Sequence, residues 1–265
     1  MKAFSKIFGV LFLLFPVLAY AGQSCVLATV VPADARVVDF DFVANGVGNF
    51  YQASLVPGRS YSVEVRQDYD DPNTDLATSI FPNATCAGAL DDTNFTDTTG
   101  QEPVLPANSF RRSFTVPGNG TAPVVYTIQT QNGGTGGRYV SVSVSDTTLF
   151  NTNWSTFSNF LTVWSFQNTT NKPIAATLTA YDNQGVPPSD PKTINFTIPA
   201  NSGVNKIIAG FAGFDINAGP QHGGFAILTH NGPPGSVLAA AEFDNPTVSP
   251  NALVPTKFEG VRQAH

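Results

Sequence analysis

Apolar and polar residues alternate along much of the chain after residue 21, and no segment there shows sustained helical periodicity. The clearest alternating segments are residues 61–66, 124–129 and 140–145. Residues 110–116 fit the same pattern with one exception, Arg112, in the apolar row. Alternation with period two is typical of strands with one buried face, as in antiparallel sheets. We therefore expect an all-β fold.

The turn signals between these segments support the same interpretation. Pro57-Gly58 separates residues 50–56 from residues 60–67 and predicts a hairpin between them. The chain holds 20 prolines and 23 glycines, spread evenly, which favours many short strands. We expect the architecture to be an antiparallel β-sandwich.

A second group of strands is predicted beyond Asp146. Residues 160–167 are apolar on both faces, which indicates a central strand buried from two sides. Five further strands are expected, over residues 174–181, 193–198, 204–208, 224–229 and 237–243.

The predicted domain boundary falls in a polar stretch without alternation. We expect a first sandwich over residues 22–146, a linker over 147–153 and a second sandwich over 154–265. One continuous sandwich of about fourteen strands is the alternative, although that is large for a single core.

The first 21 residues have the layout of a secretory signal peptide. Two lysines in residues 1–6 precede a short apolar run, which ends in Ala19-Tyr20-Ala21. The apolar run is too short to span a bilayer comfortably, and an uncleaved N-terminal anchor is the alternative. We expect a secreted protein without a transmembrane span, located at the cell surface, in the periplasm or in the medium.

Charged residues make up only 12% of the sequence, against about 25% in typical domains. Cleavage after Ala21 removes two lysines and leaves 11 basic and 19 acidic residues, a net charge of −8. Nucleic acids and anionic membranes require clustered basic residues. The sequence therefore predicts no nucleic-acid partner.

The mature chain has two cysteines, Cys25 and Cys86. In an oxidising compartment two cysteines most simply form one disulfide. A disulfide between them would close a loop of about 60 residues. In the chain-entropy model this lowers the entropy of the unfolded chain and stabilises the fold by about 4 kcal/mol. A reactive thiol is the alternative.

The first half carries a recognisable order of motifs: an aromatic-x-Val strand after Pro57-Gly58, the dipeptides Asp75-Leu76 and Asp91-Asp92, and a closing Gly-x-Tyr strand at residues 137–139. This order resembles that of bacterial pre-peptidase C-terminal domains. The resemblance covers about residues 34–146 and implies a small exported β-sandwich that accompanies a secreted enzyme. Residues 168–174 resemble a generic immunoglobulin-like sandwich of bacterial surface proteins.

The densest group of oxygen-bearing side chains lies in residues 68–75. Such side chains at short spacing can converge on a hard cation such as calcium. The candidate calcium ligands are Asp68, Asp70, Asp71, Asn73 and Asp75. Asp91, Asp92, Asn94 and Asp97 are candidates for a contribution from a neighbouring loop. The alternative is that Asp and Asn are simply favoured in turns.

The sequence carries no recognised catalytic motif: it lacks G-x-S-x-G, H-E-x-x-H, a phosphate loop and C-x-x-C. Its histidines allow two functional arrangements. One is a triad of His230, Asp244 and a serine, and the other is a metal site shared by His222 and His230. A polar turn histidine is the simpler interpretation.

Trp154 and Trp164 are the only tryptophans. We expect Trp164 in the core and Trp154 as a packing plug between domains, with an exposed platform for sugar stacking as the alternative.

Two classes of function remain. The first is an exported, non-catalytic binding or assembly protein of the cell surface or matrix, which binds itself or an extracellular polymer or protein partner through sheet edges and loops. The second is an accessory or hydrolytic protein that acts on an extracellular polymer such as polysaccharide. Residues 251–261 are expected to form either an internal last strand or one exchanged with a neighbouring copy.

Overall fold

The computed structural model describes residues 22, 24–44, 46–67, 76–90, 110–132, 137–157, 160–183, 191–208, 222–245, 247 and 252–260. These residues form sixteen strands and one turn of 3₁₀ helix, and they contain no α-helix. The expected all-β fold is therefore confirmed. In the described part of the chain there is also no helix with the length and apolar character needed to cross a membrane.

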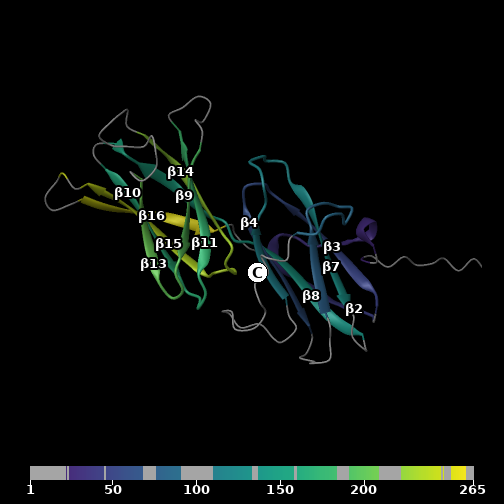
Figure 1. The fold of residues 1–265 in the computed structure, drawn as a ribbon. Coiled ribbons are helices and arrows are strands. Elements are labelled where there is room, and N and C mark those ends of the chain that lie inside the picture. Colours follow the sequence, from purple (N-terminus) through teal and green to yellow (C-terminus); the bar gives the residue numbers. More distant parts are fainter. Residues whose placement is uncertain are drawn as a thin grey trace, which may run out of the picture.

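The N-terminal half consists of two four-stranded sheets (Figure 1, purple to teal). The first has the order β1-β3-β7-β5 and the second the order β2-β8-β4-β6. The elements are η1 (Cys25–Leu27), β1 (Thr29–Val30), β2 (Asp34–Val43), β3 (Gly48–Leu55), β4 (Ser60–Gln67), β5 (Leu76–Phe81), β6 (Phe110–Thr115), β7 (Val124–Asn132) and β8 (Arg138–Asp146). All strand pairs in these sheets are antiparallel except the two-residue contact of β1 with β3.

The two sheets bury one cluster of apolar side chains between them. Tyr51 and Ile128 enter it from the first sheet, and Val63 and Val142 from the second. Arg112 occupies the inward row as the pattern of residues 110–116 predicts. Its side chain is only 2% exposed, and its Nη1 donates a hydrogen bond to the carbonyl of Leu90. Burying a guanidinium demands such partners.

The hairpin predicted around Pro57-Gly58 is wrong. β3 pairs with β1 and β7, whereas β4 pairs with β6 and β8 in the other sheet. The turn therefore carries the chain from one layer to the other. Gly58 has a φ of +76°, and its N–H donates to the carbonyl of Val116, which follows β6. A turn dipeptide between two alternating strands specifies a reversal, but it does not specify whether the strands share a sheet.

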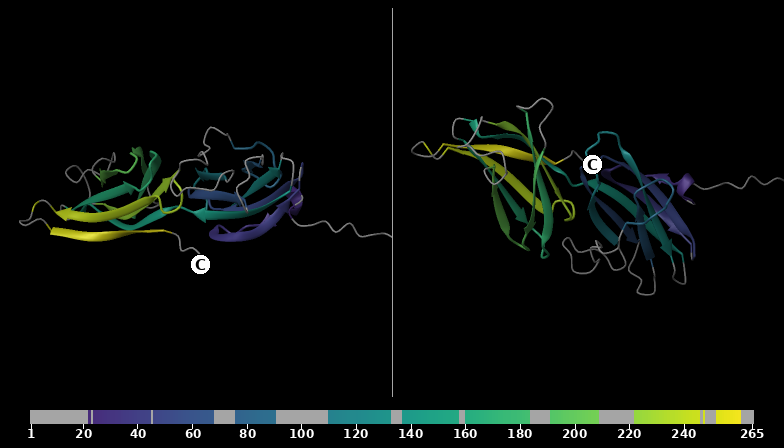
Figure 2. Two further views of the ribbon diagram at one scale, coloured as in Figure 1. Left: turned by 90° about the horizontal axis from the view of Figure 1, so that it is seen from below. Right: turned by 45° about the horizontal axis from the view of Figure 1, so that its top comes forward.

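The C-terminal half is one eight-stranded sheet with the order β12-β11-β14-β9-β16-β15-β10-β13. Its strands are β9 (Leu149–Ser155), β10 (Leu161–Asn168), β11 (Ile174–Asp182), β12 (Lys192–Ile198), β13 (Gly203–Ile207), β14 (Gly223–His230), β15 (Val237–Asn245) and β16 (Ala252–Gly260). The sheet folds back on itself, since Phe166 of β10 lies 5.4 Å from Phe196 of β12 and 5.5 Å from Phe258 of β16, measured between ring centroids. Figure 2 shows the resulting two layers, with β15 and β16 in yellow.

The strand predicted over residues 160–167 is β10, and its burial is more one-sided than expected. Trp164 and Phe166 are almost fully buried in the core of the C-terminal half. Leu161 and Val163, on the opposite face, are only half-buried. The outer face of β10 is therefore not covered by a second apolar layer.

Most of the linker expected over residues 147–153 is instead strand β9. Gly224 of β14 pairs with Trp154 and Ala226 with Asn151, so β9 carries one residue more than β14 in this interval. This β-bulge leaves Thr152 and Asn153 both exposed between two buried residues. The bulge interrupts the period of two, which explains why the sequence pattern misses this strand.

Residues 252–260 form an internal strand, so the last strand is not exchanged in this structure. β16 pairs with β15 along Ala252–Lys257 and with β9 along Phe258–Gly260. It thereby joins β12, β11, β14 and β9 on one side of the sheet to β15, β10 and β13 on the other.

A polar network connects the two halves at the step from β8 to β9. Ser60 donates its N–H to Thr148 Oγ1 at 3.0 Å, and its carbonyl accepts from the N–H of Thr147 at 2.9 Å. The guanidinium of Arg59 binds Asp146 and lies 5.4 Å from the ring centroid of Phe150. These contacts link the start of β4 to the first residues of the C-terminal half.

Candidate functional site

The predicted calcium ligands lie outside the described residues, as do Asp91, Asp92, Asn94 and Asp97. The calcium site at Asp68, Asp70, Asp71, Asn73 and Asp75 therefore stays a prediction. In the part of the chain that the structure describes, no three His, Cys, Asp or Glu side chains gather as a metal site requires.

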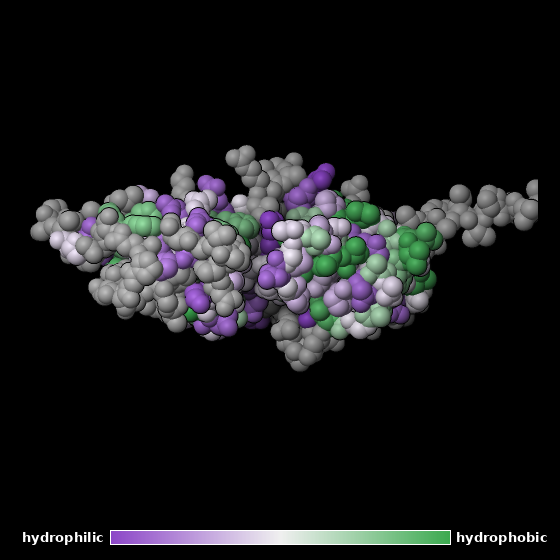
Figure 3. Space-filling model, turned by 90° about the horizontal axis from the view of Figure 1, so that it is seen from above, coloured by the Kyte–Doolittle hydropathy of each residue, from purple (hydrophilic) through white to green (hydrophobic). Residues whose placement is uncertain are grey.

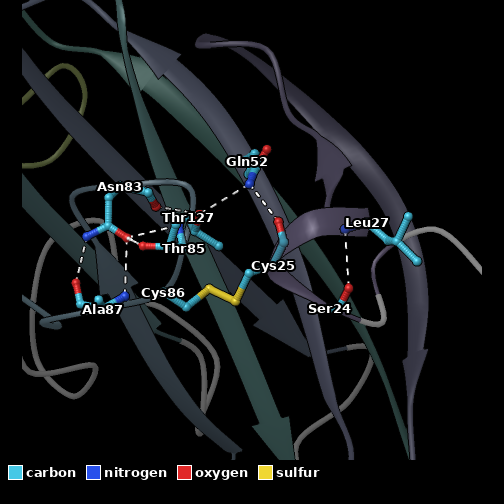
Figure 4. The surroundings of a disulfide bond; sticks show 9 residues. All are labelled: Ser24, Cys25, Leu27, Gln52, Asn83, Thr85, Cys86, Ala87 and Thr127. Carbon is cyan, nitrogen blue, oxygen red and sulfur yellow. Dashed lines mark hydrogen bonds between the residues drawn. A yellow bond between two sulfur atoms is a disulfide. The ribbon is translucent and has the colours of Figure 1, made fainter.

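Cys25 and Cys86 form a disulfide across a sequence separation of 61 residues, with their Cα atoms 6.1 Å apart. Figure 4 shows how the bond joins η1 to the segment after β5. Gln52 of β3 donates to the carbonyl of Cys25 at 2.8 Å. Asn83 Oδ1 accepts from the N–H groups of Thr85 and Ala87, which encloses Cys86 in a tight turn. The bond thus fixes the outer strands of one sheet, which is a structural role.

The histidines form neither of the two arrangements that the sequence allows. His222 precedes β14 and His230 ends it, so about eight residues of extended strand, roughly 26 Å, separate them. They cannot share one metal ion. Asp244 pairs with Leu161, the first residue of β10, whereas His230 lies beside Thr147 at the junction of the halves. The triad of His230 and Asp244 is therefore excluded as well.

Both tryptophans are fully buried in the core of the C-terminal half, so the exposed sugar platform is wrong. Trp154 also does not act as a plug between domains. Its Nε1 donates to the carbonyls of Tyr181 and Phe225, each at 3.0 Å, which ties β9 to β11 and β14 of the same sheet.

The most distinctive exposed feature is the edge strand β12, which ends the eight-stranded sheet and pairs only with β11 among the described strands. The pairing runs through seven residues without a bulge. Lys192 at its first position is the only charged residue of β12, and the strand contains no proline. An edge of this kind presents unpaired backbone N–H and C=O groups to another chain.

The two faces of β12 differ in polarity. Ile194 and Phe196 are half-buried on the inner side, while Thr193, Asn195 and Thr197 are exposed. On the outer face Thr177 donates its hydroxyl to Asn195 Oδ1 at 2.8 Å, and the hydroxyls of Thr179 and Thr193 lie 3.2 Å apart. β-branched residues and cross-strand threonine pairs stabilise a strand in this register.

Two other sheet edges carry charges along their middle. On β13, Lys206 is on the inner side, where its Nζ lies 4.8 Å from the ring centroid of Phe196. On β6, Arg112 points inward and Arg111 binds Glu64 at 2.6 Å. Charges that point inward on an edge strand oppose the approach of a further strand.

The remaining three edges are shortened, bulged or occupied. β1 has only two residues, and β2 has two irregularities in its register with β8. On β5, the N–H of Leu90 already donates to the carbonyl of Ile80 at 2.7 Å. Among the strands that the structure describes, β12 is thus the longest unbulged edge without an inward-pointing charge of its own in its middle, and Lys206 of β13 lies over its Phe196.

Among the described residues, exposed large apolar side chains are more numerous on the N-terminal half, and the face in Figure 3 shows more green there. Several of them lie at or near the short edge strand β1: Val26, Leu27 and Val30. The β1 edge offers only two residues of backbone, so a chain that paired there would gain few hydrogen bonds.

Comparison with known proteins gives no match, either to a protein-family model or to a curated protein. The resemblance of residues 34–146 to pre-peptidase C-terminal domains therefore stays a prediction.

Proposed function

We propose that the mature chain is an exported, non-catalytic assembly protein of the cell surface or extracellular matrix, and that two copies join through their β12 edges. The observation that carries this proposal is the regular edge of β12, uncharged beyond its first residue, among otherwise protected edges. The signal-like N-terminus and the disulfide support export.

A two-fold axis at Asn195, the middle of β12, would place the two strands antiparallel and join the eight-stranded sheets of both copies. The same surface then serves both partners, so each copy uses its β12 edge and the assembly closes as a dimer. Ile194 and Phe196 of one copy would meet those of the other on the inner side, which extends the apolar layer. The outer threonines and Asn195 would continue the polar face.

Sedimentation velocity of the mature protein tests the proposal. We expect a concentration-dependent dimer in the natural protein and a monomer in the variant Asn195→Lys with Thr197→Lys. The new charge at position 195 would lie opposite its counterpart in the second copy, with the charge at 197 diagonal to it, and like charges repel. Both positions are exposed, so the variant should keep its fold.

A matched control adds the same charge elsewhere. Ser54→Lys with Gln131→Lys places two lysines on exposed positions of β3 and β7, which both have neighbours on each side. This control should dimerise as the natural protein does. A natural protein that stays monomeric at every concentration, or a control that dissociates equally, contradicts the proposal.

A further inference from the structure

The C-terminal half contains a pocket of about 500 Å³ at the end away from the junction. It lies where β9 ends and β14 begins, beside the bulge and next to the end of β11 and Phe243 of β15. Its volume falls in the range of about 300–1,000 Å³ that is usual for small-ligand sites. We call it the distal pocket and define it by Asn153, Trp154, Ser155, Phe157, Phe160, Asn183, Gly223, Gly224 and Phe243.

Two of the lining residues are glycines that let neighbouring groups approach the backbone closely. A Cβ atom on Gly223 would lie 3.1 Å from the ring of Phe157 and 3.2 Å from the carbonyl oxygen of Trp154. A Cβ atom on Gly224 would lie only 1.8 Å from the carbonyl oxygen of Tyr181. The backbone therefore approaches its neighbours here as only glycine permits.

Three phenylalanines supply aromatic surface around these glycines. Phe157 is 37% exposed and lines the pocket. Phe160 and Phe243 meet edge to face, with ring centroids 6.3 Å apart and an interplanar angle of 65°. This arrangement fixes two rings without help from the ligand.

The polar groups that the described residues contribute to the pocket are neutral. The bulge on β9 exposes Asn153, and Asn183 follows the end of β11. Ser155 Oγ also belongs to the lining and accepts from the N–H of Phe157 at 3.0 Å. None of the described residues that line the pocket is ionisable. Each amide offers both a donor and an acceptor.

The rim is held by a partly buried contact just outside the described lining. His222 Nδ1 lies 2.5 Å from Asp182 Oδ2, and the N–H of His222 donates to Thr156 Oγ1 at 2.9 Å. These bonds join the end of β11, the start of β14 and the residue after β9. The pocket is therefore built on fixed elements, as a binding site requires.

We propose that the distal pocket binds one ring of a neutral sugar within an oligosaccharide. A pyranose has apolar C–H faces, which fit against phenyl rings, and a rim of hydroxyls, which bond to amides. A charged ligand would find no countercharge among the described lining residues, and desolvating it would cost free energy. A purely apolar ligand would leave the amides of Asn153 and Asn183 without their hydrogen bonds.

Saturation-transfer NMR and calorimetry of the mature protein test this assignment with four neutral hexasaccharides. The probes are glucose hexamers with β-1,4, β-1,3 and α-1,4 linkages and the hexamer of N-acetylglucosamine. We expect at least one of them to bind. Phe157→Ala should weaken that binding about three- to tenfold through the lost ring contact, whereas Phe157→Tyr should retain it. Asn183→Ala should weaken it as well.

Thr152→Ala is the matched control, because Thr152 is exposed beside Asn153 on the same bulge but does not line the pocket. Its affinity should equal that of the natural protein. The assignment is overturned if no hexasaccharide binds, if Phe157→Ala and Asn183→Ala leave the affinity unchanged, or if lauric acid binds in their place. Dimerisation through β12 is measured separately by sedimentation, so either proposal can fail alone.

Discussion

Arg59 and Asp146 form a salt bridge between the residue before β4 and the last residue of β8, with 3.1 Å between Nη1 and Oδ2. The carboxylate is almost inaccessible, and its Oδ1 also accepts from the N–H of Thr148 at 3.0 Å. It thus orders the first residues that lead into the C-terminal half.

Replacing Asp146 should destabilise the folded protein. We expect Asp146→Ala to lower the free energy of unfolding by about 2 kcal/mol, because the buried N–H of Thr148 loses its acceptor and the partly exposed guanidinium of Arg59 loses its partner. Urea denaturation measures the loss. Asp34→Ala removes the exposed ion pair with Arg36 and should leave stability unchanged. Equal losses in both variants would refute the role of Asp146.

Removing the disulfide should also destabilise the fold. Cys25→Ala with Cys86→Ala should lower the free energy of unfolding by about 4 kcal/mol, since the unfolded chain gains the entropy of an open loop. Thermal denaturation without reductant compares the variant with the natural protein. An unchanged melting temperature would argue that the bond constrains nothing.

Acid should destabilise the fold through His230. Burial lowers the pKa of this imidazole to about 4 from its usual 6.5, so the folded protein holds the proton more weakly than the unfolded chain does. The neutral form therefore stabilises the fold fully above about pH 6.5. That contribution, about 3 kcal/mol, disappears as the pH falls towards 4.

The test is the pH dependence of unfolding in urea between pH 7 and 4. His230→Asn keeps an acceptor for the N–H of Gly232 but cannot titrate, so its stability should fall less over this range than that of the natural protein. His222→Asn is the control, since His222 is partly exposed. In this variant the free energy of unfolding should still fall with decreasing pH by the amount that comes from His230. A His230→Asn variant with the natural slope would contradict the role of this imidazole.

Gly224 should tolerate no side chain. Because an added Cβ would overlap the carbonyl oxygen of Tyr181, we expect Gly224→Ala to lower the free energy of unfolding by at least about 2 kcal/mol. Gly120→Ala is the control, since a Cβ there meets no atom within 4 Å. Chemical denaturation that ranks the two variants equally would contradict the close approach of β11 and β14.

The sequence predicts the strands of the C-terminal half closely where alternation is regular. The expected strand over residues 193–198 is β12, and that over residues 237–243 is most of β15. β9 escapes detection because its bulge leaves Thr152 and Asn153 both exposed. Alternation with period two therefore predicts only those strands whose pairing contains no bulge.

The arrangement of strands in space is less accessible from the sequence. Pro57-Gly58 joins two layers instead of two neighbours, because the choice depends on partners far along the chain such as β7 and β8. The edge position of β12 follows from the same long-range order, and so does the distal pocket, which combines residues from several strands and the segments beside them. Burial of Arg112, by contrast, follows from its place in an apolar row.

The most direct test of assembly through β12 is site-specific crosslinking of the mature protein. Both natural cysteines are in the disulfide, so Asn195→Cys introduces a single free thiol at the middle of the edge. With a short bismaleimide, Asn195→Cys should give a covalent dimer in high yield, while Ser54→Cys, on an exposed position of the inner strand β3, should stay monomeric. A monomeric Asn195→Cys product, or equal dimer yields from both variants, would contradict pairing of two copies through β12.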